Sequence, residues 1–228
     1  MSRPPIFIKD LVKGNQVWKM HVRVVDLWVV KEKSGQQHLE LVIQDGKGDQ
    51  IHVVTRNQDF KEWVEQLKEH DTYAVYNGEL VVNDGSFKVC SNSLKLVFNG
   101  GTTISNIVMP EIPLHQFKFK TIGDFLNGLF QIDMLYDVIG ILQDVVKTQM
   151  GGGGKKPCAN IILREEPSNV IEVALWDDYG KQFMNYNNSN KNDGPTILIL
   201  THAWCKKNSA STPPSFQMLG MALDFTLT

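Results

Sequence analysis

The sequence has no apolar run approaching the roughly 20 residues of a membrane helix, and its first residues do not form a signal peptide. It has only three cysteines, Cys90, Cys158 and Cys205, which lie far apart. A small, odd-numbered, widely spaced set argues against a disulfide framework, a secreted protein and a zinc site built from Cys-x-x-Cys pairs. We therefore expect an intracellular globular protein in a reducing compartment, without a metal site and without a membrane partner.

The chain also lacks an excess of positive charge. Its formal net charge is −2 and its pI is about 6.3. Residues 1–112 contain 13 basic and 14 acidic residues, and the remainder contains 10 and 11. Proteins that bind nucleic acid are often more basic than this. Any site for a polyanion must therefore be a local groove.

Signals of catalysis are few. The acidic pairs at 165–166 and 177–178 are adjacent in sequence, so on strands their side chains diverge to opposite faces. The glycine-rich stretch GGGGKKP at 151–157 is not a phosphate-binding P-loop, because Lys155 is not followed by Ser or Thr. We expect no enzyme, no cofactor and no small-molecule substrate.

The pattern that is present is alternation of apolar and polar residues, which predicts strands. In the first half, the period changes once, where Phe60, Trp63, Val64 and Leu67 recur at helical spacing. The predicted order is three strands, a helix and two strands, at 18–30, 38–45, 49–56, 57–70, 71–82 and 87–99.

The second half repeats this order with larger loops, which indicates an internal repeat of about 110 residues. Its predicted strands and helix lie at 134–148, 158–165, 169–176, 177–186, 196–205 and 215–228. The stretch 100–116, with Pro110 and Pro113, is the predicted linker, and 117–129 is a lead-in segment. We predict two domains, at 1–105 and at 106–228 including the linker.

The order of elements is that of the oligonucleotide-binding (OB) barrel, a five-stranded Greek-key barrel with a helix at its base. An open sheet with the same order is the alternative, but it leaves an unpaired edge, which barrels avoid. The predicted fold class is therefore all-β with short helices, as tandem OB barrels.

The residues resemble the tandem DNA-binding domains of the large (70 kDa) subunit of replication protein A, in its plant form. In the first half the resemblance rests on WKMHVRVVDLW, ELVIQDGKGDQIHVVTR, YAVYNGELVVNDGSFKV and LKLVFN. In the second half it rests on DVIGILQDVV, IILRE, VIEVALWDDYGKQF and ILILTHA. Their order, at the right separations, covers the chain from about Ile6 to Phe216.

The resemblance implies binding of single-stranded DNA with little sequence preference, by stacking of bases on aromatic side chains. It places Phe87 on the aromatic of the turn between the fourth and fifth strands, and Trp176 on the aromatic of the third strand of the second barrel. A base of any kind has a π-face, so such a platform tolerates any sequence. The alternatives are that Phe87 is a barrel-end core residue and that Trp176 packs against Tyr179 or Phe183.

Two further positions of the first barrel, Arg56 and His52, follow from the resemblance, and a third candidate, Arg23, lies mid-strand among valines. Arg56 stands where the first barrel usually has its third-strand aromatic; a guanidinium can stack on a base or pair with a phosphate, although a solvated strand end is the alternative. His52 falls where the family often has a base-contacting charge, with an exposed strand histidine as the alternative. For Arg23, phosphate contact and pairing with an acidic neighbour are both open.

Lys155 and Lys156 are candidates for phosphate contact from a loop that closes over the strand; a flexible loop with solvated lysines is the alternative. Lys206 and Lys207 stand where the second barrel usually has its turn aromatic. Trp204 lies nearby and could replace it, unless strand alternation turns it inward. Trp18, Trp28 and Trp63 lie on apolar faces and are predicted to be core residues.

Two functions remain open at this point. The first is a nuclear single-stranded DNA-binding protein of DNA replication, repair or recombination, with other replication or repair proteins as further partners. The second is an OB-fold protein-interaction module whose groove has lost most of its affinity for nucleic acid. The balanced charge favours the second, and Phe87, Trp176 and the lysine-containing loops favour the first.

Overall fold

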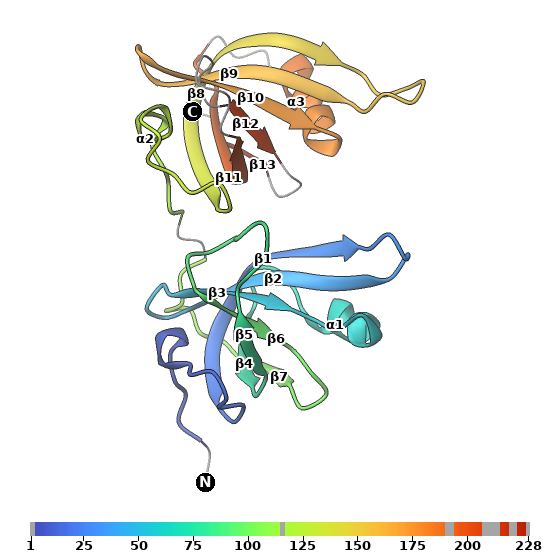
Figure 1. Cartoon of the computed structure of the whole chain (residues 1–228), viewed down its shortest axis with the longest axis vertical. Helices are drawn as coiled ribbons and strands as arrows, with labels where there is room; N and C mark the ends of the chain where they lie inside the picture. Colours follow the sequence, from blue (N-terminus) through green and yellow to red (C-terminus); the bar gives the residue numbers. More distant parts are fainter. Residues whose placement is uncertain (1–2, 115–116, 190–193, 207–214, 219–222, 227–228) are drawn as a thin grey trace. The chain divides into compact units, whose positions relative to one another are not determined.

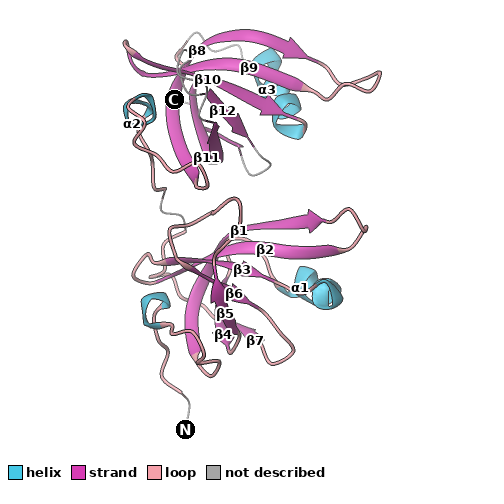
Figure 2. Cartoon of the chain, in the orientation of Figure 1, coloured by secondary structure: helices cyan, strands magenta, loops and turns pink. Residues whose placement is uncertain are grey.

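The structure is a computed structural model that describes residues 3–114, 117–189, 194–206, 215–218 and 223–226. The chain divides into two compact units, Met1–Gln116 and Phe117–Thr228. Both consist mostly of strands with a few short helices (Figure 2). Among the described residues, no helix is long and apolar enough to cross a membrane.

The first unit is a single curved sheet with a helix (Figure 1). Its strands run in the order β5-β6-β3-β2-β1-β4-β7, and η2 and α1 follow β3 along the chain. The bounds are η1 Ile8–Asp10, β1 Lys19–Lys31, β2 Gln37–Asp45, β3 Gln50–Val54, η2 Asn57–Asp59, α1 Phe60–Gln66, β4 Thr72–Tyr76, β5 Glu79–Val82, β6 Leu94–Val97 and β7 Thr103–Asn106.

A break in the predicted fourth strand brings the two ends of this sheet together. The predicted strand 71–82 is two strands, β4 and β5, separated by Asn77 and Gly78, which have φ angles of +63° and +147°. A Cβ on Gly78 would lie 2.8 Å from Cδ1 of Leu96, so both the angle and the space require glycine. β4 pairs with β1 and β5 pairs with β6, so the predicted fourth strand joins the two ends of the sheet and closes the ring of strands.

A β-bulge in β1 decides which side chains face the core. The register with β2 slips between Val24 and Asp26, so Val25 is an extra residue. Because side chains alternate along a strand, one extra residue exchanges the two faces beyond it. Met20, Val22 and Val24 point inward before the bulge, whereas Leu27 packs against the core after it and Trp28 faces outward.

The core of the first unit lies inside this ring and is closed at one end by α1. Trp63 is buried there, and its ring lies 5.1 Å from that of Phe98, between centroids. Trp18 is also fully buried, so the prediction of core positions is confirmed for these two tryptophans. It is wrong for Trp28, for the reason that the bulge supplies.

The second unit repeats the arrangement with a complete ring, because β8 pairs with β9, β9 with β10, β10 with β12, β12 with β11 and β11 with β8. Phe125 and Phe183 are fully buried inside it. The bounds are α2 Ile122–Leu126, β8 Leu135–Gln149, β9 Cys158–Glu166, β10 Asn169–Trp176, α3 Asp178–Ser189, β11 Ile197–Lys206, β12 Ser215–Met218 and β13 Leu223–Thr226.

Both units therefore have the OB-barrel order of strands, and the predicted fold class is confirmed. The predicted linker at 100–116 differs in structure from an open tether. Residues 103–106 form β7, which pairs with β4, and Ile107, Met109, Ile112 and Pro113 hydrogen-bond to the first unit. Most of this stretch is thus attached to the first barrel.

The burial of Trp63 predicts the effect of a substitution on stability. Trp63→Ala should lower the free energy of unfolding of the first unit by about 3–5 kcal/mol, because it leaves a large cavity under Phe98. Its neighbour Val64 is 42% exposed, so Val64→Ala should change the free energy by no more than about 0.5 kcal/mol. Denaturant titrations of both variants test this, and equal midpoints would contradict the packing described.

Candidate nucleic-acid interface

The outer face of β2 and β3 in the first unit, together with the loop 83–93, forms the candidate surface that we call the first-unit face. This is the part of an OB barrel that contacts oligonucleotides. The register gives one row of neighbours across the strands. Asp26 of β1 lies opposite Val42 of β2, Val42 lies opposite His52 of β3, and His52 lies opposite Lys95 of β6. His52 lies on this surface, and we include in it Arg56, which follows the end of β3 by two residues.

A cluster of four side chains occupies the middle of the first-unit face. The rings of Trp28 and His52 are stacked, with centroids 5.8 Å apart and planes 19° from parallel. His52 Nε2 lies 3.2 Å from one oxygen of Glu40, and His38 Nε2 lies 3.2 Å from the other. Since Trp28 comes from β1 and His52 from β3, the tryptophan side chain spans β2.

This cluster corrects one expectation and adds residues that the sequence analysis missed. His52 is only 6% exposed, so the alternative of an exposed strand histidine is wrong. It is covered because the bulge in β1 turns Trp28 outward. The sequence alone does not assign Glu40 and His38 to the surface. The strand register does, because it places Glu40 of β2 opposite Val54 and His38 of β2 opposite Val30.

The pKa of Glu40 is lower than the ordinary value of 4.5. Burial raises it, but the hydrogen bonds and charges of His52 and His38 outweigh burial. Glu40 is therefore a carboxylate at neutral pH. The first-unit face thus carries a negative charge at its centre, which by itself does not favour a polyanion.

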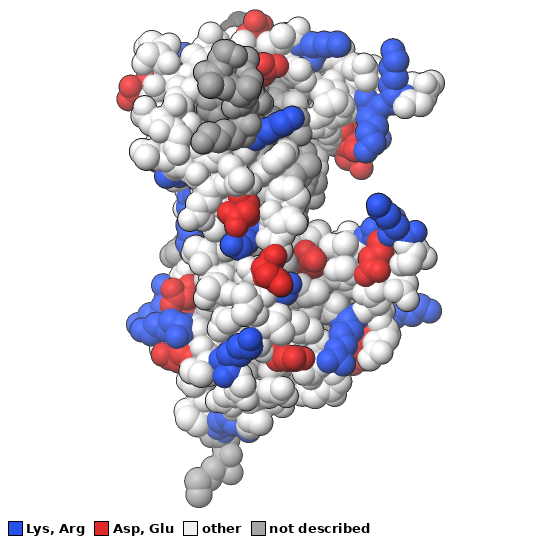
Figure 3. Space-filling model, in the orientation of Figure 1, with Lys and Arg blue, Asp and Glu red and all other residues white. Residues whose placement is uncertain are grey.

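The cations of the first-unit face have carboxylate partners. Arg56 Nη2 lies 3.9 Å from Glu79 Oε2, and Lys95 Nζ lies 3.4 Å from Asp84 Oδ1. Arg56 is half-exposed at the end of β3, so it remains accessible to a ligand. Figure 3 shows basic and acidic side chains interspersed over the visible surface of the first unit.

Phe87 stands on a loop whose base is fixed. The backbone N–H of Asn83 donates to Ser93, its side-chain amide donates to the carbonyl of Asn92, and Asn92 donates in turn to the carbonyl of Gln50 in β3. On this frame the Phe87 side chain is 43% exposed, which does not fit the alternative of a barrel-end core residue. The residues 83–86 do not form the tight hairpin turn that their composition indicates; they begin a longer loop.

Arg23 has a different environment from the other candidates. Its guanidinium donates to three main-chain carbonyl oxygens, those of Ile112 at 2.8 Å, Met109 at 3.3 Å and His70. These carbonyls stand in place of the acidic neighbour that was one of the two alternatives for Arg23. A phosphate contact by Arg23 stays a prediction that competes with these three hydrogen bonds.

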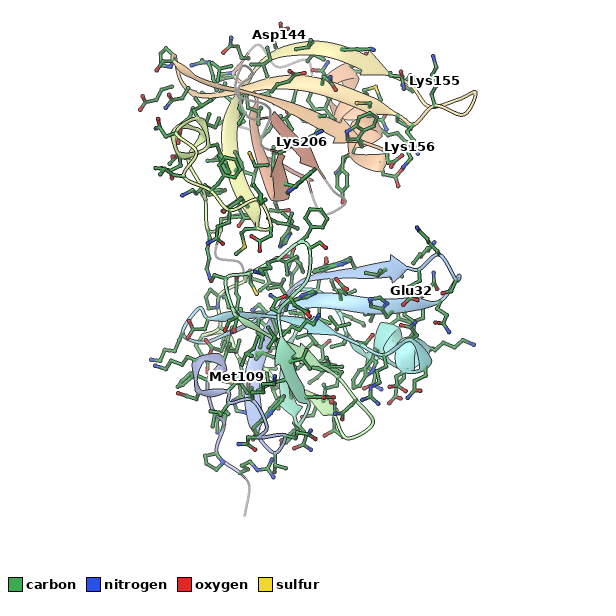
Figure 4. All side chains as sticks on the ribbon, in the orientation of Figure 1. Glu32, Met109, Asp144, Lys155, Lys156 and Lys206 are labelled. Atoms are coloured by element: carbon green, nitrogen blue, oxygen red, sulfur yellow. The ribbon has the colours of Figure 1, made fainter. Side chains whose placement is uncertain are left out.

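In the second unit, Trp176 and the two lysines of the glycine-rich stretch are neighbours; we call them the second-unit face. Trp176 ends β10 opposite Cys158 and is 37% exposed. Lys156 Nζ lies 2.8 Å from Oδ2 of Asp177, which directly follows Trp176. Figure 4 shows Lys155 and Lys156 at the end of the β8–β9 hairpin.

The hairpin that presents these lysines is ordered by hydrogen bonds. Gly152 and Lys155 exchange backbone N–H···O bonds of 3.2 and 3.1 Å, around Gly153 and Gly154, whose φ angles are +56° and +81°. Two consecutive positive φ angles define a type I′ turn, the connection that fits the twist of a hairpin. Contact of Lys155 and Lys156 with phosphates stays a prediction.

Trp204 and Lys206 lie on β11. Trp204 is flanked by the buried Ala203 and Cys205 and lies on the opposite, outer side of the strand, so alternation does not turn it inward. Its indole N–H donates to the carbonyl of Ile132 at 2.8 Å. Lys206 is exposed at the end of β11, opposite Ser215 (Figure 4). Lys207 lies outside the described residues.

Comparison with known proteins agrees with this architecture. Residues 9–125, more than half of the chain, match the family described as "Domain of unknown function DUF223". The chain belongs to the DUF223 family. The match covers the whole first barrel and its connection to the second unit, up to α2.

This DUF223 chain is also distantly similar to plant replication protein A. It is 25% identical over 171 residues to a replication protein A 70 kDa DNA-binding subunit of Arabidopsis thaliana, across 71% of the chain. The chain spans only 22% of that relative's length. The similarity confirms the resemblance found in the sequence.

Two solved structures share the fold of the DUF223 chain. One is a replication protein A heterotrimer bound to single-stranded DNA, with a TM-score of 0.60 and 16% identity over 98% of this chain and 52% of that chain. The other is p202 HIN1 in complex with a 12-mer of double-stranded DNA, with a TM-score of 0.50 and 14% identity over 96% of this chain and 98% of that chain. At such identities the likeness concerns the fold alone.

The acidic, histidine and cysteine side chains of the DUF223 chain have the following arrangement. Within the described part of the chain, no group of three or more His, Cys, Asp or Glu side chains could hold a metal ion. Burial raises the pKa of the Cys205 thiol to about 12 and also raises the pKa of Cys158, which disfavours a nucleophilic thiolate.

The environment of Glu40 predicts a dependence of stability on pH. Its pKa is lower in the folded than in the unfolded chain, so its carboxylate stabilises the fold above pH 4.5, and this contribution is lost as the pH falls through the lowered pKa. Glu40→Gln should be less stable than the wild type at pH 7 by about 1–3 kcal/mol. The difference should shrink as the pH falls below 4.5 in denaturant titrations. A difference that stays the same through this acid range would contradict it.

Proposed function

We propose that this protein binds single-stranded DNA with little sequence preference, through base stacking on Phe87 and Trp176 and contacts between phosphates and neighbouring cations. The observation that carries the proposal is the exposure of both aromatic rings on fixed supports, whereas Phe98, Phe125 and Phe183 are fully buried. A partly exposed aromatic ring forgoes part of the free energy that burial of its apolar surface would give, unless a partner covers it.

The energies expected of such platforms are adequate for binding. Stacking of a base on an aromatic side chain contributes about 1–3 kcal/mol per base. Each platform has a cation near its support: Lys95 pairs with Asp84 of the loop that carries Phe87, and Lys156 pairs with Asp177, which directly follows Trp176. The relative from Arabidopsis thaliana is named as a DNA-binding subunit, which supports a role in DNA replication, repair or recombination, and a place in the nucleus.

A second function has its own support. Arg56, Lys95 and Lys156 each face a carboxylate of the same unit, and the first-unit face has Glu40 at its centre. A surface of paired charges with exposed aromatic rings also suits contact with another protein. In that case the chain is an OB-fold interaction module, and its affinity for nucleic acid is weak.

A titration separates the two functions. Fluorescence anisotropy of a labelled thymine 30-mer and of a duplex of equal length should show tighter binding to the single strand, because stacking requires unpaired bases. The logarithm of the binding constant should fall with the logarithm of the salt concentration, with a slope of about −0.7 per neutralised phosphate. Equal affinity for both DNA forms would contradict the stacking mode, and absent binding would leave the interaction module.

Substitution of the platforms tests the residues themselves. Phe87→Ala and Trp176→Ala should each weaken binding of the 30-mer by about 1–3 kcal/mol while leaving thermal melting nearly unchanged. The matched control is Phe7→Ala, since Phe7 is 38% exposed in the first unit but does not lie on the first-unit face. The contrary result is a variant with a lower melting temperature whose folded fraction binds the 30-mer with wild-type affinity. That result would show that Phe87 or Trp176 packs in the barrel rather than stacking on a base.

A further inference from the structure

The segment that follows β7 is held against the first barrel by a continuous set of hydrogen bonds. The N–H of Ile107 donates to the carbonyl of Thr72 at 3.0 Å, and the hydroxyl of Thr72 donates back to the carbonyl of Ile107 at 2.6 Å. The N–H of Met109 donates to the same hydroxyl at 3.3 Å. Thr72 is buried, so these bonds are shielded from water.

Arg23 completes this attachment at the far end of the segment. Its guanidinium donates to the carbonyls of Met109 and Ile112, and Ile112 itself is buried. A further hydrogen bond, from Gln44 to the carbonyl of Pro113, has a donor–acceptor distance of 3.5 Å. Met109, labelled in Figure 4, lies with Phe7 and Ile112 around a pocket of about 290 Å³ on the first unit.

The second barrel takes hold of the chain a few residues later. The N–H of Lys118 donates to Asp137 Oδ2 at 3.1 Å, and Phe119 forms a β-bridge with Asp137. Four residues, 114–117, separate Pro113, which accepts a hydrogen bond from Gln44, from Lys118, which donates to Asp137. If the chain were held only as far as Met109, which donates to Thr72, the connection would run from 110 to 117, which is eight residues instead of four.

We propose that Arg23 is a positioning residue that shortens the tether between the barrels, so that both barrels engage one strand together. This inference rests on the proposed function. When two binding modules share a ligand, the second binding event occurs at an effective concentration that falls as about the −3/2 power of tether length. Arg23 holds the part of the segment beyond Met109, so release of 110–113 lengthens the tether from four to eight residues and lowers that concentration by about 3-fold.

The chemistry of Arg23 suits this task. A carbonyl oxygen is a hydrogen-bond acceptor, and the guanidinium presents five N–H donors in a fixed plane, so one side chain binds three carbonyls at once. Lysine offers a compact charge instead and cannot span Met109, Ile112 and His70 in the same geometry. A guanidinium so engaged has few donors left for a phosphate.

The test compares Arg23→Met in the 228-residue chain with the wild type, by anisotropy on thymine 8-mers and 30-mers. The 8-mer is sized for one OB barrel, which covers about 4–16 nucleotides. We expect 8-mer affinity to stay unchanged and 30-mer affinity to fall about 3-fold. A second variant, with four Gly and Ser residues inserted after Leu114 and Arg23 intact, should reproduce the same pattern.

Two outcomes would overturn the proposal. If Arg23→Met weakens the 8-mer and reduces its salt slope by about 0.7, Arg23 contacts a phosphate. If both variants bind the 30-mer like the wild type, tether length does not matter.

A measurement without DNA separates the attachment from the proposed function. In hydrogen exchange, the amide of Ile112 should be protected in the wild type and should lose protection in Arg23→Met, whereas that of Ile107, which donates to Thr72, should stay protected in both. If the protein does not bind DNA but the change in protection is observed, the proposed single-stranded DNA binding is refuted, whereas the attachment of the segment by Arg23 is supported. Unchanged protection would refute the role of Arg23.

Discussion

The first strand of each barrel must pair with two different strands, and the rest of the structure depends on how it does so. In the first unit, residues 19–23 of β1 pair with β4, and residues 22–31 pair with β2. A strand that bends from one partner to the other needs local twist, and a bulge supplies it. The bulge at Val25 lies just beyond the last residue that pairs with β4, and it exchanges the faces of β1 from that point on.

This exchange determines the chemistry of the surface as well as the core. It puts Leu27 against the core and sends Trp28 over β2 to the ring of His52, which Glu40 holds from the other side. Just before the bulge, Arg23 points away from the core and reaches the carbonyls of the connecting segment. The bend of one strand thus shapes both the first-unit face and the attachment of the chain that leads to the second barrel.

The sequence predicts the elements that alternate clearly and misleads where a single residue changes the register. The strand at 169–176 matches its prediction, because Val170, Ile171 and Val173 favour a strand and no glycine or proline interrupts it. Trp28 has the parity of Trp18, which predicts a core position, and no residue pattern marks Val25 as a bulge. The attachment of 107–113 is also invisible in the sequence, since it depends on main-chain carbonyls, which every residue possesses.

The balance of charge limits how a polyanion can be held, and it sets the relative weight of stacking. An exposed ion pair such as that of Arg56 and Glu79 contributes about 0–1 kcal/mol, so a phosphate could take the place of Glu79 at little loss. The free energy gained from the contact between Arg56 and the phosphate is also small, because the carboxylate of Glu79 remains close to the phosphate and repels it. In the proposed mode, stacking at about 1–3 kcal/mol per base therefore outweighs each phosphate contact. Sequence tolerance follows, since the dominant contact recognises the flat face of a base rather than its edges.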